Sequence, residues 1–186
     1  FIDSEREAGK NPILLDAGEV LFESNSIIKQ NLEASKYKAK AMIDGYETIG
    51  YDAVNVGGYD LSAGYTFLKS IADSTSIPFL SANLVDKKSG DHVFDPYIII
   101  DRPPYKIGVV GVTNLLPPNV TEIAMEDYLS TGKTLIKELK EKTHLVIMLV
   151  NADKKDKGKV KQEFADADYI FISRDTQKTH RTQVQT

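Results

Sequence analysis

The chain of 186 residues contains no cysteine, and this absence excludes a disulfide scaffold, a thiolate zinc site and a cysteine nucleophile. Histidine is scarce, with only His92, His144 and His180 present. No apolar run approaches the roughly 20 residues that a membrane-spanning helix needs. We therefore expect no membrane span and few imidazole ligands for a transition metal.

An excess of basic residues is also lacking, since 23 Lys and Arg face 27 Asp and Glu and the net charge is -4. A general nucleic-acid binder needs a dense basic face, so that class is excluded. A hydrophobic content of 41% is enough for a globular core. We expect one domain over residues 1–173 and a polar tail without hydrophobic period over residues 174–186.

The hydrophobic pattern alternates between strand and helix through the first eighty residues. After a short opening helix, Phe1–Ala8, it predicts a strand, a helix with a candidate break near Ser35, a strand, a helix and a strand, at residues 13–16, 26–49, 51–56, 63–72 and 79–83. Such alternation is typical of a parallel sheet with crossover helices.

The pattern then changes to strands without helices between them. Strands are predicted at residues 84–86, 93–100 and 106–113, followed by helix 127–142, strand 145–150, helix 159–164 and strand 169–172. The three consecutive strands predict a meandering, antiparallel region joined to the parallel one. The fold class is therefore mixed α/β.

Carboxylates follow several of the predicted parallel strands. If these strands share a direction, their carboxyl ends meet at one rim of the fold, where open α/β proteins bind ligands. Four loops would meet there, at residues 16–19, 57–60, 151–153 and 173–176, and would bring together Asp16, Glu19, Asp60, Asp153 and Asp175. Carboxylates suit a hard cation such as Mg²⁺ or Ca²⁺. Simple hydration of acidic surface loops is the alternative.

Two other stretches are candidates for phosphate binding. Ser130–Thr134 imitates the end of a P-loop, but it lies within a predicted helix and its earlier glycine is absent, so we reject it. The basic stretch Lys154–Lys161 could hold a phosphate, although lysine-rich loops are usually solvated surface.

A family resemblance follows from four segments taken together. Leu14–Glu19, Gly50–Asp60, Ser81–Leu84 and Lys106–Thr113 have the order and spacing found in bacterial periplasmic 5'-nucleotidases, a branch of the calcineurin-like metallophosphoesterases. The resemblance implies a four-layer αββα sandwich with two mixed β-sheets, here incomplete at the N-terminus. It also implies a periplasmic or extracellular location and a dinuclear metal site that activates water.

The family's metal motifs are altered in this chain. Its first motif, Asp-x-His, would precede Phe1. The bridging aspartate of its Gly-Asp motif corresponds to Glu19, and the Asn-His pair of its third motif corresponds to Gly58 and Tyr59. A glycine offers no side-chain ligand, and a tyrosine with an ordinary pKa near 10 is a poor proton donor at neutral pH.

The last two motifs have lost their histidines as well. Asn151 occupies one histidine position, and Arg174 and Thr176 occupy two others. A guanidinium repels a metal cation. We therefore expect no catalytic residue, with Tyr59 and Asp60 only at family positions. We expect no resident metal, with Asp16, Glu19, Gly58, Asn151, Arg174 and Thr176 as remnant positions. A cation, if any, would be Mg²⁺, Ca²⁺ or Mn²⁺.

Three functions follow from these motifs. The first is a non-catalytic domain kept for binding or assembly, with a protein partner or further domains of a longer polypeptide. The second is an active phosphohydrolase with an oxygen-rich metal site around Glu19, Asp60, Asp153 and Asp175. In the third, an anionic ligand binds without turnover at Gly57, Gly58, Asn151 and Arg174.

Overall fold

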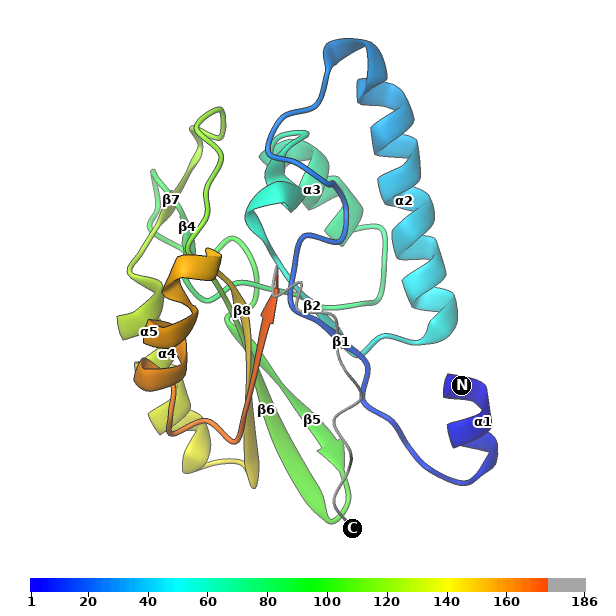
Figure 1. The fold of residues 1–186 in the computed structure, drawn as a ribbon, viewed down its shortest axis with the longest axis vertical. Coiled ribbons are helices and arrows are strands. Elements are labelled where there is room, and N and C mark those ends of the chain that lie inside the picture. Colours follow the sequence, from blue (N-terminus) through cyan, green and yellow to red (C-terminus); the bar gives the residue numbers. More distant parts are fainter. Residues whose placement is uncertain (174–186) are drawn as a thin grey trace.

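Three short parallel strands form the first sheet of the protein. The structure is a computed structural model that describes residues 1–173. Strands β1 (Leu15–Asp16), β2 (Ala53–Asn55) and β3 (Phe79–Leu80) lie in the order β1-β2-β3, all parallel, as the sequence pattern predicted (Figure 1). The ladders are short because each strand ends at a polar or glycine-rich loop. The loops at their carboxyl ends therefore begin next to one another.

The second sheet is longer and mixed. Its order is β5-β6-β8-β9, with β5 (Tyr97–Arg102) antiparallel to β6 (Tyr105–Thr113), and with β6, β8 (Leu145–Asn151) and β9 (Tyr169–Ser173) parallel. Strand β8 carries a continuous apolar run and is buried from Val146 to Asn151. Such runs are typical of strands covered on both faces.

Helices lie on the outer side of each sheet. Figure 1 shows α2 (Leu32–Ile49) and α3 (Tyr65–Ala72) on one side, and α4 (Tyr128–Lys140) and α5 (Lys157–Glu163) on the other. Helix α1 (Ile2–Glu7) begins the chain. Short 3₁₀ turns complete the described elements: η1 (Lys29–Asn31), η2 (Gly58–Leu61) and η3 (Lys154–Asp156).

Three hydrophobic clusters separate these layers. The middle cluster lies between the two sheets and includes Ala53, Leu80, Val109, Ile147 and Leu149. The outer clusters join the first sheet to α2 and α3, and the second sheet to α4 and α5. The fold is therefore a mixed α/β sandwich of four layers, helix, sheet, sheet and helix, and the predicted αββα architecture is confirmed.

The predicted meander is confirmed for its last two strands, since β5 and β6 form an antiparallel hairpin, but the pairing of its first strand is wrong. Strand β4 (Leu84–Asp86) pairs antiparallel with β7 (Ile123–Met125), a strand that the sequence did not predict, and not with β5. Strand β5 begins only at Tyr97; before it, His92 makes a single bridge to Val85. Strand β7 is only three residues long, and a distant partner stabilises it, so no local pattern revealed it.

The long predicted helix is shorter and has no break. Helix α2 begins at Leu32 and continues through Ser35 to Ile49, where Gly50 ends it in a left-handed conformation with φ of 84°. Its buried residues Ala39 and Ile43 pack into the core, and this packing outweighs the weak helix propensity of one serine. Residues 26–28 are not helical.

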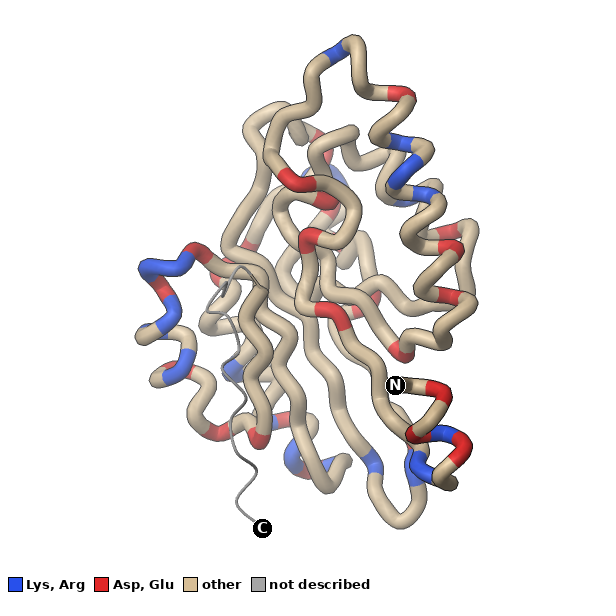
Figure 2. The backbone as a smooth tube through the Cα atoms, turned by 45° about the vertical axis from the view of Figure 1, so that its right-hand side comes forward, with Lys and Arg blue, Asp and Glu red and all other residues tan. Residues whose placement is uncertain are grey.

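The distribution of charge agrees with the weak net charge of the chain. Figure 2 shows acidic and basic positions interspersed along α2, and basic positions gathered where η3 and α5 lie. These are the lysines of the basic stretch Lys154–Lys161. Within residues 1–173, no helix has the length and apolar character needed to cross a bilayer. The predicted tail, with Arg174, Asp175, Thr176 and His180, lies outside the described residues.

Candidate functional site at the strand ends

The loops after β1 and β2 lie in direct contact at the rim. Gly18 has φ of +105° and Glu19 has φ of 70°, an uncommon conformation for a residue other than glycine. A Cβ atom on Gly57 would lie 2.6 Å from the backbone nitrogen of Glu19, and one on Gly18 would lie 2.9 Å from the nitrogen of Gly57. Only glycines allow the two turns to approach so closely.

The buried carboxylate of Asp60 joins these two turns by hydrogen bonds. One carboxylate oxygen accepts hydrogen bonds from the backbone N–H groups of Glu19 and Gly57, both at 2.8 Å, and the other accepts from that of Leu21 at 2.9 Å. The side chain is fully buried. Burial raises the pKa of Asp60 to about 7, against the opposing effect of these backbone donors. Both carboxylate oxygens are therefore occupied by hydrogen bonds from backbone N–H groups.

Asn151, at the end of β8, joins the second sheet to the same rim. Its Oδ1 accepts hydrogen bonds from the backbone N–H of Gly58 and from the Thr113 hydroxyl, both at 2.9 Å, and its Nδ2 donates to Ser173 Oγ at 2.6 Å. The side chain is fully buried. Asn151 thus joins three of the four predicted loops, through Gly58, its own position and Ser173, and Asp60 joins the fourth through the Glu19 N–H.

Leu115 fills the space beside Gly58. A Cβ atom added to Gly58 would lie 2.6 Å from Leu115 Cβ and 3.2 Å from the Leu115 carbonyl oxygen. Real Cβ atoms essentially never lie within 3.0 Å of another such atom, so a neighbour would have to move. Here the neighbours include the backbone of Leu115, which makes that movement costly. The position that corresponds to the family's asparagine ligand is therefore closed to a longer side chain in this arrangement.

Asp16 makes contacts of its own at the end of β1. Its Oδ1 accepts from the Gly18 N–H at 2.8 Å, and its Oδ2 accepts from the Tyr46 hydroxyl at 2.8 Å. Burial and this carboxylate together raise the pKa of Tyr46. The Tyr46 ring also stacks on Tyr51, with centroids 3.8 Å apart. Asp16 thus links the end of β1 to helix α2 through Tyr46.

A cavity of about 330 Å³ opens next to these residues. Tyr59, Gly58 and Asp153 line it together with Asn25 and the loop Leu115–Pro118. Asp153 is 3.6 Å from Lys155 Nζ across a partly exposed ion pair. The cavity is lined by prolines and leucines as much as by polar groups, and the predicted site residues that it brings together are Gly58, Tyr59 and Asp153.

The described residues do not fit a dinuclear metal centre. Residues 1–173 contain no group of three or more His, Asp or Glu side chains that could hold a metal ion. His92 lies in the loop before β5, and His144 Nδ1 accepts from the backbone N–H of Lys106 at 3.0 Å, so neither belongs to the rim network. A dinuclear site needs about four ligands per ion, several of them imidazoles for Mn, Fe or Zn. No step through a metal follows from this geometry.

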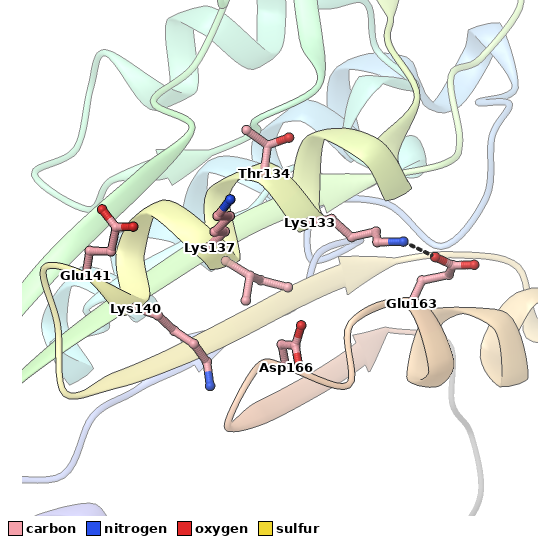
Figure 3. A pocket seen from close by; sticks show the side chains of 8 residues that line it. Lys133, Thr134, Lys137, Lys140, Glu141, Glu163 and Asp166 are labelled. Carbon is pink, nitrogen blue, oxygen red and sulfur yellow. Dashed lines mark hydrogen bonds and ion pairs between the residues drawn. The ribbon is translucent and has the colours of Figure 1, made fainter.

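A larger cavity, of about 600 Å³, lies away from the rim between α4 and the end of α5. Figure 3 shows the lining side chains Lys133, Lys137 and Lys140 on α4, and Glu163 and Asp166 opposite that helix; Lys133 pairs with Glu163 at 2.6 Å. The lining contains three lysines and three acidic residues, Glu141, Glu163 and Asp166, so a ligand of a single charge sign is not favoured. The stretch Ser130–Thr134 lies inside α4, which confirms that it is not a P-loop.

Asn83 exchanges two hydrogen bonds with the backbone of Thr113, at 2.7 and 3.0 Å, and so holds the loop backbones. Two other residues of this region were missed from the sequence. Asn55 was missed: its Nδ2 donates to the carbonyls of Ala17 and Val112 and links the two sheets. A polar residue within the apolar run 53–56 was the signal for it. No signal in the sequence indicated Leu115.

Comparison with solved structures places this architecture among phosphoesterases. The calcineurin-like phosphoesterase YfkN from Bacillus subtilis superimposes with a TM-score of 0.72 over 92% of this chain and 60% of its own, at 17% sequence identity. A putative 5'-nucleotidase from Staphylococcus aureus gives a TM-score of 0.75 over 92% of this chain and 38% of its own, at 15% identity. The fold is thus that of the calcineurin-like phosphoesterases.

Sequence comparison then identifies the branch. A 5'-nucleotidase of Vibrio parahaemolyticus is 30% identical over 139 residues, which cover 71% of this chain and 25% of that protein. No family model matches the chain. The chain is a homologue of the bacterial 5'-nucleotidases within the metallophosphoesterases, and it spans about 25 to 30% of the length of the first curated relatives that it matches.

Proposed function

We propose that this chain is a 5'-nucleotidase-like domain without catalytic activity, kept for binding or assembly. The observation that carries the proposal is the packing around Gly58. Leu115 closes the space that a ligand side chain would need, and Asn151 directs its oxygen to the Gly58 N–H. Both positions correspond to metal ligands in the family and here maintain the fold.

The other described rim groups support the same proposal. Asp60 directs both oxygens to backbone N–H groups, and Asp16 directs both to Gly18 and Tyr46. A carboxylate with such partners must give up good hydrogen bonds before it can coordinate a cation. Arg174 and Thr176, outside the described residues, add to the proposal from the sequence alone.

The test is a hydrolysis assay with a measured metal content. Purified protein, incubated with Mn²⁺ or Zn²⁺ and freed of excess ion, is assayed with AMP and with p-nitrophenyl phosphate. We expect no hydrolysis above that of an Asn151→Ala preparation handled identically, which controls for contaminating phosphatase. A rate that rises in proportion to bound metal would refute the proposal.

An active phosphohydrolase with a rebuilt oxygen-rich site is the second candidate. The contact between the Glu19 turn and Asp60 favours it, since two carboxylate residues meet there; Asp153 lies at the nearby cavity, and Asp175 lies outside the described residues. This function requires a bound Mg²⁺, Ca²⁺ or Mn²⁺. The test is elemental analysis of bound metal in the native protein and in Glu19→Gln after loading with each ion. Equal and negligible metal in both proteins would exclude this candidate.

Anion binding by the Gly57–Gly58 turn is the third candidate, and the structure offers it little support. The Gly57 N–H donates to Asp60 and the Gly58 N–H donates to Asn151, so an anion would have to displace a side chain from each. Calorimetry with inorganic phosphate and with AMP tests it, and a saturable heat that disappears in Arg174→Gln would support it. From the family resemblance we also propose a periplasmic or extracellular location, and a role as part of a longer polypeptide or with a protein partner.

A further inference from the structure

The cavity of about 600 Å³ beside α4 exists because α4 and α5 differ in length. Helix α4 has 13 residues and α5 has seven. The end of α5 lies against Gly132, where an added Cβ atom would lie 2.6 Å from the Phe164 ring. Beyond that point the turn after α5, and not a helix, lies opposite the second half of α4. A groove, named here the α4 groove, therefore runs between Ile136–Lys140 and the turn that carries Asp166.

The turn that carries Asp166 is held in place by backbone and side-chain hydrogen bonds. Asp168 accepts from the Val146 N–H at 2.7 Å through its carboxylate, and its own N–H donates to the Val146 carbonyl at 2.9 Å. The Ala167 N–H donates to the Phe164 carbonyl, also at 2.9 Å. Because the turn is already ordered, a ligand in the α4 groove would lose little affinity to the ordering of this wall.

The two walls of the α4 groove carry charged side chains, and only some of these are paired. Lys133 and Glu163 lie 2.6 Å apart, and their hydrogen bond raises the pKa of Lys133 and lowers that of Glu163. Among residues 1–173, the side chains of Lys137, Lys140 and Asp166 form no hydrogen bond or ion pair. Lysines and a carboxylate are therefore available to a ligand on opposite walls.

Lys137 and Lys140 form the basic wall. They stand three positions apart in the last turn of α4, so their side chains are neighbours on the helix surface. One carboxylate can accept hydrogen bonds from both ammonium groups. Lysines in a last helical turn also stabilise the helix dipole, and this effect does not occupy their N–H donors.

Asp166 forms the acidic wall, and an apolar floor lies between the walls. Figure 3 shows Asp166 on the turn opposite the α4 lysines. The floor includes the buried side chain of Ile136, and the methylene stems of the lysines add apolar surface beside it. The α4 groove thus offers donors for an anionic group, an acceptor for an ammonium group, and apolar contact between the two.

We propose that the α4 groove binds a short peptide whose two termini are both free. The peptide carboxylate lies between Lys137 and Lys140, its ammonium group lies at Asp166, and an apolar side chain lies over Ile136. A ligand of one charge sign would meet like charge on one wall, whereas a zwitterion meets opposite charge on both.

The size of the α4 groove favours a peptide of two or three residues. Its volume of about 600 Å³ lies within the range of roughly 300–1,000 Å³ that is typical of small-molecule sites. The groove lies on the outer side of the second sheet, away from the rim. The inference therefore goes beyond the proposed function and stands whether or not the rim binds a metal.

The experiment titrates peptides into the full chain and follows the protein by NMR. The probe is Ala-Leu-Ala with free termini, at about pH 6.5, where both termini are charged. Its controls are the N-acetylated peptide, the C-amidated peptide and free leucine. We expect saturable shifts of the Ile136 methyl groups and of the Lys140 and Asp166 amides at about millimolar peptide. Each blocked peptide should bind about fivefold more weakly. Amides of β8 report on the fold throughout.

Two variants assign one terminus to each wall. Lys137→Met/Lys140→Met keeps the apolar stems and should bind the free peptide no better than the C-amidated one. Asp166→Asn should bind it no better than the N-acetylated one. The matched controls are Lys38→Met/Lys40→Met and Asp44→Asn, at exposed positions of α2, and both should keep the two preferences of the native protein.

Four results would each overturn the proposal. They are no saturable shift at about 10 mM peptide, equal binding of the free and the blocked peptides, loss of the same preferences in the α2 control variants, and free leucine binding as tightly as Ala-Leu-Ala. The last result would assign the α4 groove to a single amino acid and not to a peptide.

Discussion

Replacing Gly58 by alanine adds a single Cβ atom at the place where Leu115 is packed. That atom would lie 2.6 Å from Leu115 Cβ and 3.2 Å from the Leu115 carbonyl oxygen, so either the loop or the 3₁₀ turn must shift. Overpacking of this kind costs about 1–3 kcal/mol. We expect the free energy of unfolding to fall by about 2 kcal/mol and Tm to fall by about 4–8 °C.

The assay is urea unfolding followed by circular dichroism, with Gly158→Ala as the matched control. Gly158 lies in α5, and a Cβ atom there would meet nothing within 4 Å. Alanine should therefore be neutral or stabilise α5 by up to about 1 kcal/mol, because glycine is a poor helix former.

A double-mutant cycle separates the contact from other effects. Leu115→Gly removes the Cβ atom that Gly58→Ala would approach, so the two changes together should cost at least about 1 kcal/mol less than the sum of their separate costs. If Gly58→Ala is as stable as the native protein, the loop has room to move. The steric argument against a ligand at residue 58 would then be wrong.

Three further predictions test the rim and the sheets. Asn151→Ala leaves the Gly58 N–H and the Thr113 hydroxyl without their acceptor, and should cost about 1–3 kcal/mol in urea unfolding; a cost below that of Ser173→Ala would contradict it. Because burial raises the pKa of Asp60 to about 7, above the ordinary value of 3.8, its contribution to stability is full below pH 4 and is lost as pH rises toward 7. Asp60→Asn should lack this loss, so the stability difference, native minus variant, should shrink between pH 4.5 and 7.5; a constant difference would refute the shift. Gly111→Ala places a Cβ atom against Asn55 Oδ1 and 2.8 Å from Leu80 Cβ, so it should separate the sheets and destabilise the protein more than Gly108→Ala, whose nearest contact is the flexible end of Leu139 at 3.0 Å.

Local pattern was enough for most of the fold. Strand β8 is a continuous apolar run and α4 has regular helical spacing after the capping residue Asp127, whose side chain accepts from the Ser130 N–H at 2.7 Å. These signals come from neighbours in sequence. Strand β7 lacked such a signal, because its stability depends on pairing with β4, nearly forty residues earlier.

The candidate site was only partly predictable. The sequence determined which residue types stand at the strand ends: Glu19, Gly58 and Asn151 at positions of the family's metal ligands, and Tyr59 at the position of its proton-donating histidine. Only the tertiary structure decided what those residues do. Asn151 meets Gly58 across 93 positions of chain, and Leu115 approaches Gly58 from a loop between them in sequence.

The physical reason is the range of the interactions. Hydrophobic period and capping act over a few residues, so they determined most of the helices and strands and their order, with β7 as the exception. The four layers followed from the family resemblance. Hydrogen bonds such as those of Asp60, and steric contacts such as that between Gly58 and Leu115, exist only when distant loops are brought together. Only the tertiary fold decided that these polar groups form hydrogen bonds with one another.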